Sequence, residues 1–106
     1  MSKYAGWKQL EREIRRDLED AGYEAKRLWD VQFEEGGGVD VLAKPFAVQC
    51  KYGSRPPMKQ AWKEAKKAMP EMTPVAVCRF KGEKTTLAVL SWKDLLSLVK
   101  QLKSET

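Results

Sequence analysis

The stretch Phe46-Ala47-Val48-Gln49-Cys50-Lys51-Tyr52 decides the fold, because its side chains alternate between two faces as those of a β-strand do. Phe46, Val48, Cys50 and Tyr52 fall on one face, and Gln49 and Lys51 project together from the other. A β-branched run at residues 39–43 precedes this stretch, and Lys44-Pro45 between the two is typical of a turn. The sequence therefore predicts a β-hairpin over residues 39–52.

Helical periodicity flanks the hairpin on both sides. Apolar residues three and four apart predict a helix over residues 4–21, ended by Gly22, and a second over residues 58–69. Strands are expected at residues 23–29, 73–80 and 85–90, and an acidic, glycine-rich loop at residues 30–38. The last helix should start at a Ser91 cap and bury Trp92, Leu95, Leu96, Val99 and Leu102. This α-β-β-β-α-β-β-α order predicts an α/β fold with a mixed sheet flanked by helices, in which the helix at 58–69 connects two parallel strands.

Length and composition narrow the function classes. The 106 residues suit one domain, residues 1–106, and no apolar run is long enough for a membrane span. The N-terminus has no export signal, so we expect an intracellular, cytoplasmic protein. The absence of histidine excludes Ser-His-Asp and Cys-His catalysis and imidazole zinc sites. Cys50 and Cys78 lie in apolar runs and are expected to be buried thiols.

Charge is distributed unevenly along the chain. Residues 1–50 carry 8 basic and 10 acidic side chains, a net charge of −2, whereas residues 51–106 carry 12 and 5, a net charge of +7. Such asymmetry favours an anionic partner, most often nucleic acid. The basic segment after the hairpin offers Ser54 and Arg55 in a loop and Lys59 and Lys63 on the next helix as contacts to the DNA backbone. A solvated, lysine-rich helix face is the alternative interpretation of the two lysines.

Three polar positions lie where apolar residues are expected. Glu11 projects inside the apolar stripe of the first helix, either with a functional role or as a stripe-edge residue paired with Arg15, one turn on. Asp40 stands between two valines and, if the hairpin pairs as predicted, shares a face with Gln49 and Lys51. An edge hairpin with a solvated polar face would explain each of these residues singly, but explains the whole set less well.

Such a set suits phosphodiester hydrolysis. That reaction needs a hard divalent cation held by oxygen ligands, a water that loses its proton near the cation, and positive charge beside the phosphate. The carboxylates of Glu11 and Asp40, the side-chain oxygen of Gln49 and the backbone carbonyl of Cys50 could hold Mg²⁺, with Mn²⁺ as a substitute. Lys51 could position or deprotonate the water, or stabilise the developing charge.

Asp40 with Gln49-Cys50-Lys51 resembles the PD-(D/E)XK nuclease signature, with Gln49 where an acid usually stands. Leu10-Glu11-Arg12-Glu13-Ile14 and Arg27 look like the archaeal-type Holliday-junction resolvases, and a stand-alone chain this small resembles the phage-encoded versions of these enzymes. The resemblance covers residues 7–52 and implies a restriction-endonuclease-like core. It also implies that Glu11, Asp40, Gln49 and Lys51 are catalytic, and that Arg12 and Arg27 contact DNA.

Other functions stay open beside junction resolution. The Gln-x-Lys variant is also typical of Mrr-like restriction nucleases, which cut ordinary duplex. Glutamine is neutral, so a catalytically weak DNA-binding module of the same fold is a further alternative, and a plain interaction domain is another. Because a four-way junction must be nicked on two strands, resolution predicts a homodimer. Met58, Trp62, Met69 and Trp92 are the candidates for its interface, unless they fill the monomer core.

Overall fold

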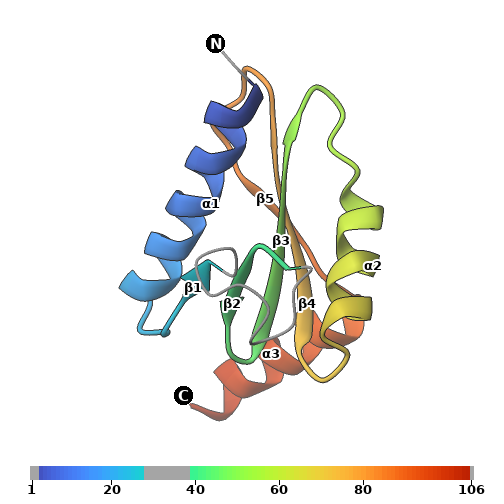
Figure 1. The fold of residues 1–106 in the computed structure, drawn as a ribbon. Helices are drawn as coiled ribbons and strands as arrows, with labels where there is room; N and C mark the ends of the chain where they lie inside the picture. The colour runs from blue at the N-terminus through green and yellow to red at the C-terminus, as the bar shows by residue number, and fades with distance from the viewer. Residues whose placement is uncertain (1–2, 28–38, 106) are drawn as a thin grey trace.

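The computed structural model of the chain describes residues 3–27 and 39–105, in which helices flank a mixed five-stranded sheet (Figure 1). The predicted acidic loop at residues 30–38, and Leu28 and Trp29 of the predicted first strand, lie outside these residues. Helix α1 (Lys3–Asp20) is followed by β1 (Lys26–Arg27), β2 (Val41–Ala43) and β3 (Phe46–Gly53). Helix α2 (Met58–Ala68), β4 (Thr73–Phe80), β5 (Leu87–Val89) and α3 (Trp92–Ser104) complete the fold.

The sheet is mixed, and its strands lie in the order β1-β2-β3-β4-β5. The predicted hairpin is confirmed, because β2 and β3 pair antiparallel with Val41 opposite Val48. The predicted crossover is also confirmed, because β3 and β4 pair parallel along all eight residues and α2 connects them. β1 and β5 pair antiparallel at the two edges. β1 begins at Lys26 rather than at residue 23, and β5 covers Leu87–Val89 rather than residues 85–90.

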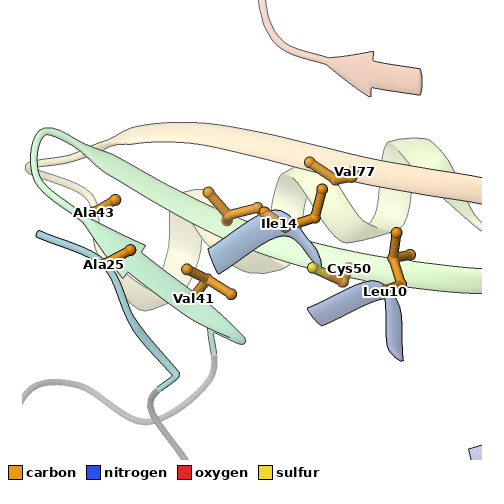
Figure 2. Packing of buried hydrophobic residues seen from close by; sticks show 8 residues of the cluster. Leu10, Ile14, Ala25, Val41, Ala43, Cys50 and Val77 are labelled. Atoms are coloured by element: carbon orange, nitrogen blue, oxygen red, sulfur yellow. The ribbon is translucent and has the colours of Figure 1, made fainter. Parts of the chain in front are cut away.

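Two helices cover opposite faces of the sheet, and the alternation of β3 follows this division. Leu10 and Ile14 of α1 pack in one core cluster with Val48 and Cys50. Figure 2 shows Leu10, Ile14 and Cys50 of this cluster in close-up. On the other face, Ala65 of α2 packs with Leu42 and Ala47. A second cluster beneath α2 joins Ala61, Ala76 and Cys78, with Met58 and Trp62 against it. Gln49 and Lys51 therefore leave β3 on the face that α2 covers.

The helix ends follow their sequence signals. Gly22 has a φ of +98°, and the N–H groups of Gly22 and Tyr23 donate to the carbonyls of Glu19 and Leu18, which is a Schellman cap. The Ser91 side chain accepts a hydrogen bond of 3.1 Å from the backbone N–H of Asp94, as predicted for the start of α3. Among the described helices, none is long and apolar enough to cross a membrane.

The prediction that α3 buries its apolar face is wrong. α3 has no buried residue, and Trp92, Leu95, Leu96, Val99 and Leu102 are all exposed, Trp92 by 71% and Leu102 by 65%. The reason lies in the sheet. α1 and α2 already cover its central strands, and β5, the edge strand before α3, is itself largely exposed. None of the core clusters formed by the described residues includes a residue of α3.

Candidate functional site

The candidate site begins at Asp40, where the hairpin opens. Asp40 occupies a bend just before β2, and its backbone N–H donates to the carbonyl of Val48 at 3.0 Å. Its side-chain Oδ2 accepts a hydrogen bond of 2.8 Å from the backbone N–H of Cys50. The Asp40 carboxylate thus accepts the hydrogen bond that a backbone carbonyl of the neighbouring strand would otherwise accept, at the point where β2 and β3 separate. Because the N–H and C=O of one residue point to the same edge of a strand, the Cys50 carbonyl faces this opening too.

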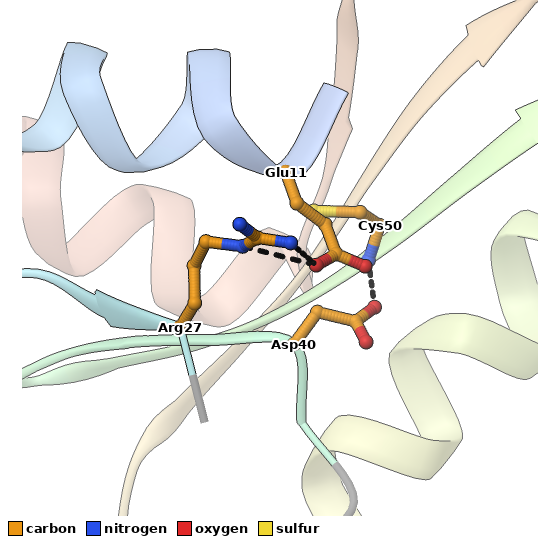
Figure 3. A network of polar contacts seen from close by, with 4 residues as sticks. All are labelled: Glu11, Arg27, Asp40 and Cys50. Atoms are coloured by element: carbon orange, nitrogen blue, oxygen red, sulfur yellow. Dashed lines mark hydrogen bonds and ion pairs between the residues drawn. The ribbon is translucent and has the colours of Figure 1, made fainter. Parts of the chain in front are cut away.

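Glu11 reaches the same opening from α1. Its Oε1 accepts hydrogen bonds from Nη2 and Nε of Arg27 on β1, at 3.1 and 3.3 Å (Figure 3). The two side chains are only 3% and 6% exposed, which makes this a buried ion pair. The alternative that Glu11 pairs with Arg15 is wrong, because Arg15 forms an ion pair of 3.5 Å with Glu19 on the surface of α1.

A small pocket joins the two carboxylates. It has a volume of about 130 Å³, and its lining comes from α1, β1 and the start of β2: Trp7, Lys8, Glu11, Arg27, Val39 and Asp40. Glu11 and Asp40 are 29 positions apart in the sequence, so only the tertiary fold places them together. Trp7 and Lys8 were not predicted as part of the site. They lie four and three residues before Glu11, which is the spacing of neighbours on one helix face.

Gln49 and Lys51 complete the predicted set from the α2 side of β3. Gln49 is 6% exposed, and its Oε1 is buried without a hydrogen-bond partner among the described residues. The ammonium group of Lys51 lies 3.5 Å from a carboxylate oxygen of Glu64 on α2. Glu64 was not predicted, although it is the one acidic residue within the sequence of α2 and lies beside the buried Ala61 and Ala65. Neither Gln49 nor Lys51 lines the pocket that Glu11 and Asp40 share.

Burial raises the pKa of the Asp40 carboxyl above its ordinary value. The Cys50 N–H and the positive charges of Lys51 and Arg27 act against this shift, and the charge of Glu64 adds to it. Asp40 therefore lies within electrostatic reach of groups on both faces of the sheet. Burial also raises the pKa of the Cys50 thiol far above its usual range, and the nearby carboxylates of Asp40 and Glu11 add to that shift. Cys50 is thus a neutral structural thiol, as expected.

The predicted DNA contacts divide into two groups. Arg12, Ser54, Arg55, Lys59 and Lys63 are exposed. Arg27 instead lies under α1 with its guanidinium on Glu11, so the structure does not bring it to the surface. The basic side chains of α2 are also not all free, because Lys66 lies over the Trp62 ring at 5.2 Å from its centroid.

The oxygen donors at the opening are few. Within residues 3–27 and 39–105, no group of three or more His, Cys, Asp or Glu side chains is placed to hold a metal ion. The predicted ligand set is of another kind, with two carboxylates, one amide and one backbone carbonyl. Comparisons of the chain with protein-family models, with curated proteins and with solved structures find no match. Any functional assignment therefore depends on the residues and geometry of this site.

Proposed function

We propose that this protein is a metal-dependent, structure-selective DNA endonuclease of the restriction-endonuclease-like fold, which resolves four-way junctions by paired symmetric nicks. One observation carries the proposal. Glu11 and Asp40, from α1 and the hairpin, line one pocket at the point where β2 and β3 separate, and Lys51 acts electrostatically on Asp40. Two carboxylates that share a pocket at a sheet opening, with an ammonium group that acts electrostatically on one of them, suit hydrolysis of a phosphodiester.

The donor set fits Mg²⁺ or Mn²⁺. Asp40 and Glu11 provide negative oxygens, and the Cys50 carbonyl faces the same opening. The buried Oε1 of Gln49 has no hydrogen-bond partner among the described residues, and an unsatisfied amide oxygen of this kind is costly unless a cation or its water occupies it. When bound, such a cation supplies an acidified water and neutralises charge on the phosphate.

The neighbouring residues of the chain have separate tasks in this proposal. Arg27 holds the Glu11 carboxylate in a fixed orientation, and the Cys50 N–H does the same for Asp40. Lys51 carries the positive charge that orients the attacking water or stabilises the developing negative charge. Glu64 holds the Lys51 ammonium group from α2 and so limits where it can move. Gln49 stands where a third carboxylate would bind the metal more tightly.

DNA would approach along the exposed basic residues near this opening. Ser54 and Arg55 follow β3 directly, and Lys63 is exposed on α2. Arg12 is exposed on α1, next to the buried Glu11. These residues are suited to phosphate contacts, which position a nucleic acid without reading its sequence. Selectivity for DNA shape rather than sequence follows from such a surface.

The test is cleavage of an end-labelled four-way junction in the presence of Mg²⁺, with a linear duplex of the same length beside it. We expect paired nicks at symmetric positions on two opposed strands of the junction, and much slower cutting of the duplex. Asp40→Asn, and Glu11→Gln combined with Arg27→Met so that no unpaired buried charge is left, should each lower the rate by about 100-fold or more while the junction is still bound, because the phosphate contacts remain. Glu19→Gln and Asp20→Asn, on the exposed side of α1, are matched controls and should cut normally.

Other outcomes would assign a different function. Faster cutting of the linear duplex would favour an Mrr-like nuclease, for which the buried, neutral Gln49 is the supporting feature. Salt-dependent junction binding without cleavage in Mg²⁺ or Mn²⁺ would indicate a DNA-binding module. Absence of any salt-dependent DNA affinity would refute the nucleic-acid proposal altogether.

A further inference from the structure

The outer face of α3 carries an apolar surface that the monomer leaves exposed. Its members are Trp92, Leu95, Leu96, Val99 and Leu102, spaced so that they share one side of the helix, and all five are exposed. We call them the α3 face. From the exposed fractions and ordinary side-chain areas, this face amounts to roughly 500 Å². Contiguous apolar patches above a few hundred Å² mark interaction sites more often than accidental exposure.

The stability of α3 gives a second reason to expect a partner. A helix of 13 residues is marginal in water by itself, because most helical stability in proteins comes from packing an apolar face. The Ser91 cap satisfies one backbone N–H at the start of α3 and adds only a small part of the stability that a helix needs. No residue of α3 is buried within the monomer. Burial of the α3 face by another molecule would supply the packing that stabilises a helix, which the monomer does not provide.

An apolar groove adjoins the α3 face. It is lined by Met58, Lys59 and Trp62 of α2 and by Val89, Leu90 and Ser91, and its volume is about 370 Å³. Ser91 is the N-cap of α3, so the groove ends where the α3 face begins with Trp92. One chain therefore carries an apolar projection and an apolar hollow side by side.

We propose that the α3 face and this groove together form the interface of a two-fold homodimer. A two-fold axis brings the same patch of both copies together. The α3 face of each copy can then fill the groove of the other. Burial of the α3 face and the groove on both copies removes roughly 1,000 Å² or more, which reaches the size of a specific interface. A lipid surface would match the protruding helix but would leave the hollow unfilled. This inference does not depend on nuclease activity.

The interface differs from the surface that the sequence suggested. Met58, Trp62 and Trp92 remain in it, Met58 and Trp62 as groove walls and Trp92 as the most exposed apolar residue of α3. Met69 does not, because it packs on the core cluster of Val39, Leu42 and Ala47. The leucines and the valine of α3, which sequence periodicity assigned to the monomer core, take the place of Met69.

Sedimentation equilibrium of the full chain over the micromolar range tests the proposal. We expect a dimer of twice 12.1 kDa, and a dissociation constant raised roughly 30-fold or more by Trp92→Glu or by Leu102→Glu. Gln101→Glu adds the same charge on the polar side of α3 and should leave the dimer intact. Far-UV circular dichroism and a cooperative melt show whether each variant is folded. We expect all of them to be folded, because the substituted residues are exposed.

Several results would overturn the inference. A monomeric wild-type chain across this range would do so, and so would Trp92→Glu and Leu102→Glu variants that still form dimers. Binding of the wild-type monomer to phosphatidylglycerol–phosphatidylcholine vesicles, lost in the same two variants, would assign the α3 face to a lipid surface instead. Because none of these measurements uses DNA, failure of the dimer and failure of the nuclease proposal are distinguished directly.

Discussion

Single substitutions of Glu11 or Arg27, which form a buried ion pair, should strongly lower the free energy of unfolding. Glu11→Gln removes one charge and leaves the Arg27 guanidinium in a place where it is 6% exposed. Breaking a buried ion pair from one side costs about 3–5 kcal/mol, because the remaining charge is desolvated without compensation. Domains of this size have about 5–15 kcal/mol of stability in total, so either single variant should lose a large part of it.

A double-mutant cycle measures this effect by urea denaturation at pH 7. We expect Glu11→Gln and Arg27→Met each to lower the free energy of unfolding by about 3–5 kcal/mol. The double variant should recover most of that loss, because no unpaired charge remains in it. The exposed pair of Arg15 and Glu19, 3.5 Å apart on α1, is the matched control. Arg15→Met and Glu19→Gln should each cost less than about 1 kcal/mol.

Two results would refute this reasoning. If the losses of the two single variants simply add in the double variant, the side chains are not coupled as the structure shows. If each single variant costs no more than its counterpart on the surface of α1, the pair is not desolvated. The recovered double variant also separates stability from function, because it should be folded but inactive in cleavage.

The remaining predictions concern Asp40, Gln49 and the two cysteines. Burial raises the pKa of the Asp40 carboxyl above 3.8, so between these two pKa values the folded state holds a proton that the unfolded state has lost. The contribution of Asp40 to the free energy of unfolding is therefore fully present below pH 3.8 and is lost as the pH rises through the raised pKa. Asp40→Asn should therefore be more stable than the wild type at pH 7 and closer to it at pH 4, by urea denaturation; a variant less stable at both pH values would contradict the burial of that charge. Without metal, Gln49→Glu should have a lower thermal midpoint than the wild type, because it buries a charge. Mg²⁺ or Mn²⁺ should restore the midpoint of this variant, at metal concentrations below those that the wild type needs for cleavage. Metal dependence equal to that of the wild type would show that residue 49 is not a ligand. Cys50 and Cys78 are fully buried, and burial raises the pKa of both thiols, so a thiol-specific disulfide reagent should modify them only as fast as the protein unfolds; rapid labelling of the native chain would disagree with their placement.

Sequence periodicity predicts much of this fold because each central element buries a complete face. β3 alternates between the side chains that meet α1 and those that meet α2, so a period of two suffices to place Gln49 opposite Cys50. The same principle made Glu11 visible as a charge inside an apolar stripe. Glu11 and Gln49 are both buried in the structure, which confirms that these two polar positions lie inside the fold.

Other features could not be predicted because they depend on contacts between distant elements. Arg27 shares its strand face with the buried Ala25, yet a buried arginine is stable only opposite a carboxylate, and nothing in the sequence near Arg27 identifies Glu11 as that partner. The pattern of α3 likewise shows that one of its faces is apolar, but not which surface covers it. Periodicity identifies an apolar face, and only the arrangement of the other elements shows whether the monomer uses it.

The distribution of charge at the site explains why Asp40 is the group that a ligand would act on. Arg27 offsets the charge of Glu11 within the sheet, and Glu64 and Lys51 offset each other near the surface of α2. Asp40 is held by a neutral backbone N–H, and burial raises its pKa. Among these five groups, one negative charge is left over on Asp40, and Lys8 is the further charged residue in the lining of the same pocket. A divalent cation bound at that carboxylate, as proposed above, would compensate this charge.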